Sequence, residues 1–125
     1  MIDPKRLELD LWPGEPWQAH PDRLAWKTWL DGATVDLERL QSGWRPTTEE
    51  IERAAAVDEW RLTGPEGLCL GGIAWGHPTI ANGHWIITSQ LCAIDSTNWK
   101  WARTVSRLYK LGRRKGSALK DTEAT

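Results

Sequence analysis

The sequence predicts a small α+β domain in which an N-terminal helical hairpin packs on a four- to five-stranded antiparallel sheet or an SH3-like partial barrel. Three observations support this prediction. Apolar residues recur at helical spacing over 22–42, a second helix start follows directly, and from residue 60 to 111 short apolar segments alternate with turn residues. The chain has 125 residues, 40% of them hydrophobic and 26% charged, which suits one globular domain.

The first helix is predicted over residues 22–42 from the spacing of its apolar positions. These positions follow one another by three or four residues and are Trp26, Leu30, Ala33, Leu37 and Leu40. Thr47 and Glu50 have the spacing of a capping box and predict a short second helix over 48–56. Because the connection between the two helices is tight, we expect them to form an antiparallel hairpin.

Strands are predicted over residues 60–63, 68–75, 84–95 and 103–111. A turn at 64–67 joins the first two strands. Asn82 and Gly83 predict a type I′ turn before the third strand, since both residues tolerate positive φ. The pair Gly71-Gly72 indicates a bulge within the second strand. We expect Trp26, Leu30, Leu37, Trp60, Leu70, Ile73, Ile86 and Ile94 to lie in the core.

The segment 98–111 allows two interpretations. Its basic residues follow helical spacing, which would give an amphipathic helix, whereas Val105 and Tyr109 favour a strand. We prefer the strand because the sheet needs a closing strand. Strand alternation then places Arg103 and Arg107 on the same side as Val105 and Tyr109, with Lys110 facing the other way.

The domain is expected to occupy residues 22–112. Residues 1–21 hold most of the prolines and predict an extended arm, and residues 113–125 predict a basic, flexible tail. The amino terminus lacks the apolar run of a signal peptide, and two cysteines are too few for a disulfide scaffold. We therefore expect a cytoplasmic protein, in the host cytoplasm if a phage encodes it, with no membrane partner.

The charge distribution and the aromatic content are both unusual. Acidic residues outnumber basic ones over 1–60, the reverse holds over 61–125, and no carboxylate lies between Asp95 and Asp121. The chain has 10 tryptophans, 1 tyrosine and no phenylalanine. Some tryptophans are expected to be half-exposed anchors, although tryptophan could equally replace phenylalanine in the core.

The segment 76–89 contains candidate catalytic and metal-binding side chains. A Ser–His pair would need an oriented acid, and Ser89 lies in no nucleophile-elbow pattern. Two histidines, His77 and His84, could bind zinc together with Cys69 and Cys92, but no close pair of ligands is present. We predict no catalytic site, no metal site, no cofactor and no small-molecule substrate, and we assign both histidines to a turn.

The string GHPTIANGHWIITSQLCAID followed by WARTVSRLYKLG resembles a family of small uncharacterised bacterial and prophage proteins. The residues that carry the resemblance are Gly76, His77, Pro78, Gly83, Ile86 or Ile87, Thr88, Ser89, Ile94, Asp95, Arg103, Thr104, Tyr109, Leu111 and Gly112. With the upstream helices it covers residues 34–112. The resemblance implies a small β-domain with two helices, no known enzymatic activity, and a binding or inhibitory role on a mobile element.

We therefore expect a non-enzymatic protein that contacts a protein partner, such as a phage or prophage inhibitor of the anti-CRISPR kind acting on a host complex. The alternative is a nucleic-acid-binding or regulatory protein that uses the basic segment 98–116, where aromatic rings lie between cations. The candidate partner-binding residues are Trp99, Lys100, Trp101, Arg103, Arg107 and Lys110, with both Trp99 and Trp101 expected to be exposed.

Overall fold

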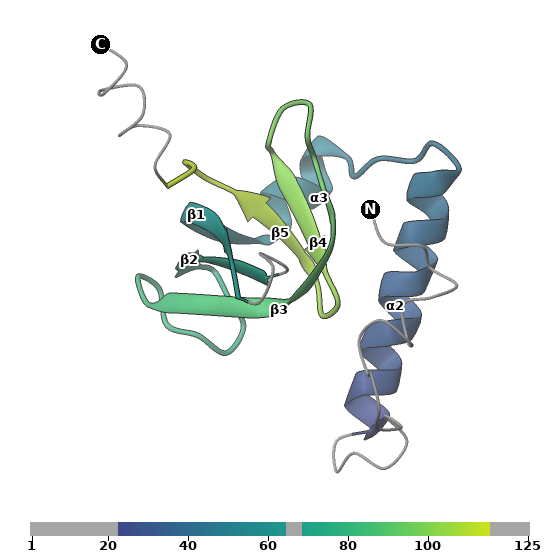
Figure 1. Ribbon diagram of the computed structural model, residues 1–125, viewed down its shortest axis with the longest axis horizontal. Helices are drawn as coiled ribbons and strands as arrows, with labels where there is room; N and C mark the ends of the chain where they lie inside the picture. Colours follow the sequence, from purple (N-terminus) through teal and green to yellow (C-terminus); the bar gives the residue numbers. More distant parts are fainter. Residues whose placement is uncertain (1–22, 65–68, 116–125) are drawn as a thin grey trace.

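The computed structural model describes residues 23–64 and 69–115. In this part of the chain, two helices lie outside a closed barrel of five strands (Figure 1). The arm predicted at 1–21, most of the turn predicted at 64–67, and the tail from residue 116 onward lie outside the described residues. The predicted α+β class with a small barrel is confirmed.

Helix α2 (Arg23–Gln41) covers one side of the barrel with its predicted apolar face. Four of its side chains form a buried cluster with residues of the barrel wall, namely Leu30, Ala33, Leu37 and Leu40 with Cys92, Ala93, Trp101 and Val105. Beyond the helix, Gly43 takes a φ of +101°, a left-handed conformation that favours glycine. The amide of Trp44 then donates to the carbonyl of Arg39 at 2.9 Å and closes the last turn.

Helix α3 (Thr48–Arg53) begins with the predicted capping box, in which Thr47 and Glu50 exchange side-chain and backbone hydrogen bonds. It ends earlier than the predicted residue 56. Strand β1 starts at Ala55 because Ala55 and Val57 alternate into the barrel core, and this burial overrides the helix propensity of the alanines. The predicted helical hairpin is not confirmed, since α2 packs against β3 and α3 against β5.

The barrel consists of β1 (Ala55–Thr63), β2 (Cys69–Trp75), β3 (Trp85–Ile94), β4 (Trp101–Thr104) and β5 (Leu108–Leu111). Each strand pairs antiparallel with the next, and β5 returns to pair with β1 in parallel. An odd number of strands in a meander makes the first and last parallel. The prediction of a wholly antiparallel sheet is therefore wrong, because β1 and β5 are parallel.

Three pairings are irregular and bend the strands around the barrel. One of them is β3–β4, where the register shifts between Leu91 and Ala93. The β1–β2 register shifts between Asp58 and Arg61, and the β2–β3 register shifts between Cys69 and Gly71, where a bulge was predicted. A Cβ on Gly72 would lie 2.5 Å from the Val57 side chain, so the chain needs glycine at this close approach.

The segment 98–111 is neither the single strand nor the helix considered from the sequence. Strands β4 and β5 run antiparallel and the chain reverses between them, with the Thr104 amide donating to the Arg107 carbonyl at 2.9 Å. Arg103 and Arg107 therefore do not lie on one strand, and the prediction that strand alternation places their side chains on the same face does not apply. The side chain of Ser106 also meets Ser89 of β3 at 3.1 Å, which fixes the reversal against the neighbouring strand.

The predicted type I′ turn at Asn82 and Gly83 is wrong. Gly83 has a φ of +84°, but among the described residues the non-glycines with positive φ are Glu59 and Trp99, so Asn82 does not adopt the turn. Instead, the Asn82 side chain accepts a hydrogen bond from the Gly76 amide at 2.7 Å and helps to close a longer loop over 76–84.

The predicted core is mostly confirmed. Leu30, Leu37, Trp60, Leu70 and Ile86 are buried, Ile73 and Ile94 are half-buried, and the side chain of Trp26 lies outside the described part. A second buried cluster fills the barrel itself and includes Trp60, Leu70 and Tyr109. Within the described residues, neither helix is long and apolar enough to cross a membrane.

Candidate functional site

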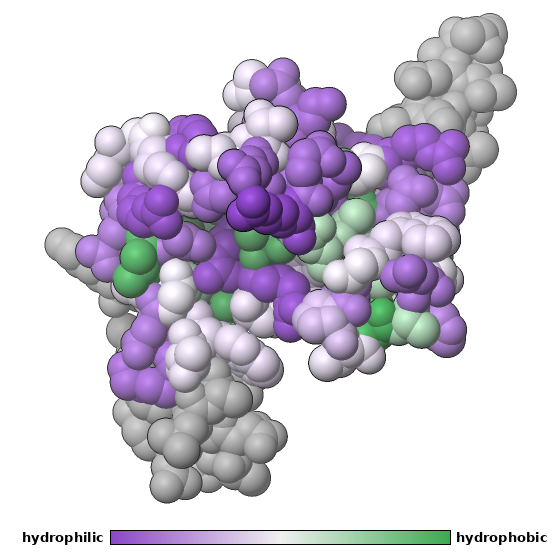
Figure 2. All heavy atoms as spheres, turned by 180° about the vertical axis from the view of Figure 1, so that it is seen from behind, coloured by the Kyte–Doolittle hydropathy of each residue, from purple (hydrophilic) through white to green (hydrophobic). Residues whose placement is uncertain are grey.

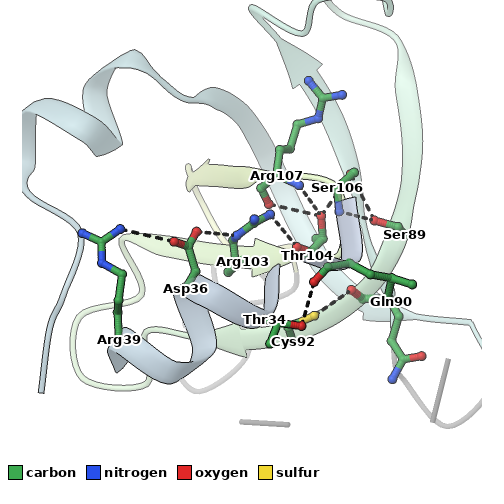
Figure 3. A network of polar contacts seen from close by, with 11 residues as sticks. Thr34, Asp36, Arg39, Ser89, Gln90, Cys92, Arg103, Thr104, Ser106 and Arg107 are labelled. Atoms are coloured by element: carbon green, nitrogen blue, oxygen red, sulfur yellow. Dashed lines mark hydrogen bonds and ion pairs between the residues drawn. The ribbon is translucent and has the colours of Figure 1, made fainter. Parts of the chain in front are cut away.

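Two of the six predicted partner-binding residues lie in the interior. Trp101, expected to be exposed, is buried in the cluster between α2 and the barrel. The Arg103 side chain is only 9% exposed; its Nε donates to Asp36 of α2 at 2.8 Å, and its Nη1 donates to the Thr104 carbonyl at 2.8 Å (Figure 3). Arg103 therefore ties the helix to the barrel and presents no free cation to a partner.

The other four predicted residues are divided between separate places. Arg107 lies half-buried at the reversal after β4, and Lys110 forms an ion pair with Glu52 of α3 at 2.9 Å. Trp99 and Lys100 both line a cleft between the 95–100 loop and the segment that follows β5. Of the predicted set, only these two residues line this cleft.

This Trp60–Trp99 cleft has a volume of about 540 Å³. Its lining residues are Asp58, Trp60, Asn98, Trp99, Lys100, Leu111, Gly112, Arg113 and Arg114. The ring centroids of Trp60 and Trp99 lie 5.7 Å apart with an interplanar angle of 34°. The Arg114 guanidinium lies 5.0 Å from the Trp60 ring centroid and 5.1 Å from that of Trp99, so one cation contacts both rings.

The 95–100 loop places Trp99 in the cleft. The Asp95 carboxylate accepts hydrogen bonds from the amides of Thr97, Asn98 and Lys100 at 3.0–3.1 Å. Partial burial raises the pKa of Asp95, but these backbone N–H groups outweigh that effect and leave the pKa below its usual range. The ionised carboxylate therefore fixes the loop, in which Trp99 has a left-handed φ of 54° and stays 39% exposed.

The opposite wall is formed by residues that were assigned to the tail. The Trp60 amide donates to the Arg113 carbonyl at 3.0 Å, and the Lys115 amide donates to the Trp60 carbonyl at 2.7 Å. The Trp60 indole N–H donates to the Gly112 carbonyl at 3.2 Å, and Asp58 accepts from the Arg113 amide at 2.9 Å. Residues 113–115 therefore extend the sheet along β1, and Arg113 and Arg114 line the cleft, so the tail does not begin at 113.

Backbone strain is concentrated around this cleft. Glu59 has a φ of 49° and directly precedes Trp60, while Trp99, with its φ of 54°, contacts Trp60 across the cleft. In the described part of the chain these two are the non-glycine residues with positive φ. Left-handed backbone costs a residue with a side chain about 1–2 kcal/mol, and such residues tend to cluster at functional sites.

The segment 76–89 forms a loop and a strand rather than a reactive cluster. Among the described residues, no group of three or more His, Cys, Asp and Glu side chains could hold a metal ion. Burial raises the pKa of the Cys92 thiol to about 11, so it stays protonated at neutral pH and is a poor metal ligand. His77 Nδ1 accepts hydrogen bonds from the amides of Thr79 and Ile80 at 3.1 and 3.2 Å.

Residues 25–124 match the model of a family of unknown function (DUF6634). The chain belongs to this family. No match was found among curated proteins or among solved structures. The match agrees with the expectation of a family without an assigned activity, and it spans all five strands of the barrel.

The cleft of this DUF6634 protein contains residues that sequence reasoning did not select. Trp60 was assigned to the core, and Arg113 and Arg114 to the tail. The only sequence signal was the basic run of residues 113–115, within the segment 98–116 that the alternative interpretation used. Pairing of this run with Trp60 joins residues more than fifty positions apart, and no local pattern encodes it.

His77 is expected to make the stability of this DUF6634 protein dependent on pH. Burial, and secondarily the charge of Arg107, lowers the pKa of His77 in the folded state below its ordinary value of 6.5. Because the unfolded chain then binds the proton more readily, the contribution of His77 is complete above about pH 6.5 and is lost as the pH falls below it. His77→Asn should keep an acceptor for both amides without titrating.

Urea unfolding at a series of pH values checks this prediction. The free energy of unfolding of the wild type should fall relative to that of His77→Asn between about pH 6.5 and pH 5. His84→Asn, at an exposed position in the same loop, serves as the control. Parallel curves for the wild type and His77→Asn would contradict the role of the neutral imidazole.

Proposed function

We propose that the protein is a non-enzymatic binding protein and that the Trp60–Trp99 cleft binds single-stranded nucleic acid. The observation that carries this proposal is the Arg114 guanidinium in contact with both tryptophan rings at an open cleft. Single-stranded nucleic acid is bound by aromatic rings on which bases stack and by cations that follow the phosphates. Trp99 supplies the half-exposed ring, and Arg114 supplies a planar, bidentate donor for a phosphate.

The charges around the cleft support an anionic ligand. Lys100, Arg113 and Arg114 line it together with a single carboxylate, Asp58, which is paired with Arg113 at 3.8 Å. The side chain of Asn98 adds a donor and an acceptor that could meet a base edge. The segment 113–115 lies on the side of the barrel away from α2, the helix that carries Asp31, Asp36 and Glu38 (Figure 1).

The exposed acidic residues of the two described helices favour single-stranded over double-stranded nucleic acid as the ligand. Many duplex-binding proteins insert a helix into the major groove and neutralise phosphates along it. Helix α3 is short and exposes Glu49, Glu50 and Glu52, and α2 exposes Asp31 and Glu38. A barrel that offers a ring and flanking cations instead suits unstacked bases.

A second candidate function is contact with a protein partner, including a host complex blocked by an inhibitor of the anti-CRISPR kind. The observation that favours it is a set of exposed apolar side chains on the barrel, namely Leu62, Trp75, Trp85 and Ile87. On the face seen in Figure 2, however, apolar residues form small separate patches among hydrophilic ones. Because the predicted anchors Arg103 and Trp101 are buried, nucleic-acid binding is the function that the cleft supports better.

Salt dependence tests the proposed function. Titration of a labelled oligothymidylate by fluorescence anisotropy should give a log affinity that falls linearly with log salt concentration, with a slope of roughly −0.7 per phosphate contact. Arg114→Gln should make that slope less steep by about 0.7 and weaken binding at every salt concentration. Trp99→Ala should weaken binding with little change in slope, because it removes stacking and leaves the charge unchanged.

The matched control is Arg39→Gln. Arg39 is also an arginine over a tryptophan, 3.8 Å from the Trp44 ring centroid, but it lies on α2. Its replacement should leave both the affinity and the slope as in the wild type. Absence of binding at low salt, or equal effects of the two arginine variants, would reject the cleft as a nucleic-acid site and leave the protein-partner candidate.

A further inference from the structure

We propose that the binding site continues from the cleft onto the outer face of β1–β3, where Trp85 forms a second stacking position, so that the ligand is an oligonucleotide rather than a mononucleotide. This inference rests on the proposed function. Trp85 begins β3 and is 41% exposed, which leaves part of the ring open to a base. The inference adds a second ring, two further cations and a minimum length for the ligand.

A glycine on the neighbouring strand leaves room for the Trp85 ring. A Cβ built on Gly71 of β2 would lie 3.3 Å from the Trp85 ring and 3.0 Å from the Thr63 side chain. Glycine at this position therefore leaves the space that the ring occupies against the sheet. The ring therefore packs closely over Gly71 on one side, and its exposed part offers an aromatic surface that suits a base of any identity.

Two cations lie over the same ring. The Arg61 guanidinium is 5.1 Å from the Trp85 ring centroid, and the Lys115 ammonium is 5.5 Å from it. The combination of one half-exposed tryptophan with neighbouring cations thus occurs twice on this barrel, at Trp99 and at Trp85. At each position a base can replace a cation on the ring face while that cation turns to the adjoining phosphate.

The segment 113–115 joins the two positions. Arg114 contacts the rings of the cleft, and the next residue, Lys115, contacts Trp85. On the neighbouring strand, Trp60 belongs to the cleft and the next residue, Arg61, contacts Trp85. On each of these two segments, one residue contacts the cleft and the next contacts Trp85. The two stacking positions therefore lie on either side of the short pairing between β1 and the segment 113–115. A ligand that fills both must cross this pairing and needs more than one nucleotide.

The test compares two lengths of ligand. Fluorescence anisotropy is measured for a labelled thymidine dinucleotide and for an oligothymidylate of about eight nucleotides. Trp85→Ala should weaken binding of the longer ligand by about tenfold and binding of the dinucleotide by less than about twofold, because the dinucleotide can still occupy the cleft. Trp85→Phe should retain most of the affinity, and Trp85→Leu, which keeps apolar volume over Gly71, should lose it.

Trp75→Ala is the control, since Trp75 is 47% exposed on the same sheet and, within the described residues, no cation lies over its ring. It should bind both lengths as the wild type does. Equal losses at both lengths for Trp85→Ala, or no loss at either, would overturn the second stacking position while leaving the cleft intact. If neither length binds the wild type, the proposed function itself fails.

Discussion

Replacing Arg103 with alanine is expected to lower the free energy of unfolding by about 2–4 kcal/mol. The Arg103 side chain is 9% exposed and forms an ion pair with Asp36 at 2.8 Å, so its loss leaves the carboxylate without its buried partner. The cost should fall somewhat below that of a fully buried pair because the Asp36 side chain is 24% exposed and water can reach it. Urea unfolding followed by circular dichroism measures the change.

A neighbouring arginine on the same carboxylate provides the control. Arg39 also pairs with Asp36, at 3.4 Å, but its side chain is 46% exposed, and Arg39→Ala should cost at most about 1 kcal/mol. The double variant Asp36→Ala with Arg103→Ala should lose less stability than the sum of the losses of the two single variants, because each single change removes the same ion pair. Additive losses, or a cost for Arg103→Ala as small as that for Arg39→Ala, would show that the pair does not hold α2 on the barrel.

Arg103 also shows where sequence reasoning about the site failed. A basic residue between Ala102 and Thr104 suggests an exposed strand position, and Asp36 lies 67 residues away on a helix. The reversal after β4 carries no glycine, proline or asparagine; it is held by the Thr104 hydroxyl and by the contact of Ser106 with Ser89 of β3. These are tertiary contacts that the local sequence does not reveal. The prediction extended the alternation of strand side chains through the turn and therefore misplaced the side chains of Arg103 and Arg107.

The elements that were predicted well are those whose signals are local. The apolar spacing of α2 and the capping box at Thr47 each depend on residues within a few positions of one another, and both appear as expected. Strand β1 illustrates the opposite case. Its first residues are alanines with high helix propensity, and only burial against β2 and β5 makes them a strand. Of the cleft, the sequence could indicate Trp99 and Lys100, but not their approach to Trp60.

Replacing Trp99 with glycine is expected to weaken binding of single-stranded nucleic acid by at least about tenfold, the loss that follows removal of one stacked ring. Trp99→Ala should have the same effect on binding, because both changes remove the indole that forms one side of the cleft. The two variants should differ in stability. At a φ of 54°, alanine keeps the strain of a left-handed residue with a side chain, whereas glycine does not.

Trp99→Gly should therefore be more stable than Trp99→Ala by about 1 kcal/mol in urea unfolding, with binding lost equally in both. Such a result would mean that the 95–100 loop holds its ring at a cost to stability, and that a residue better suited to the backbone cannot perform its role. The Asp95 carboxylate, which accepts three backbone hydrogen bonds, is what offsets this cost. If binding survives in Trp99→Gly, the strain has a purely structural origin, and the cleft is not where the ligand stacks.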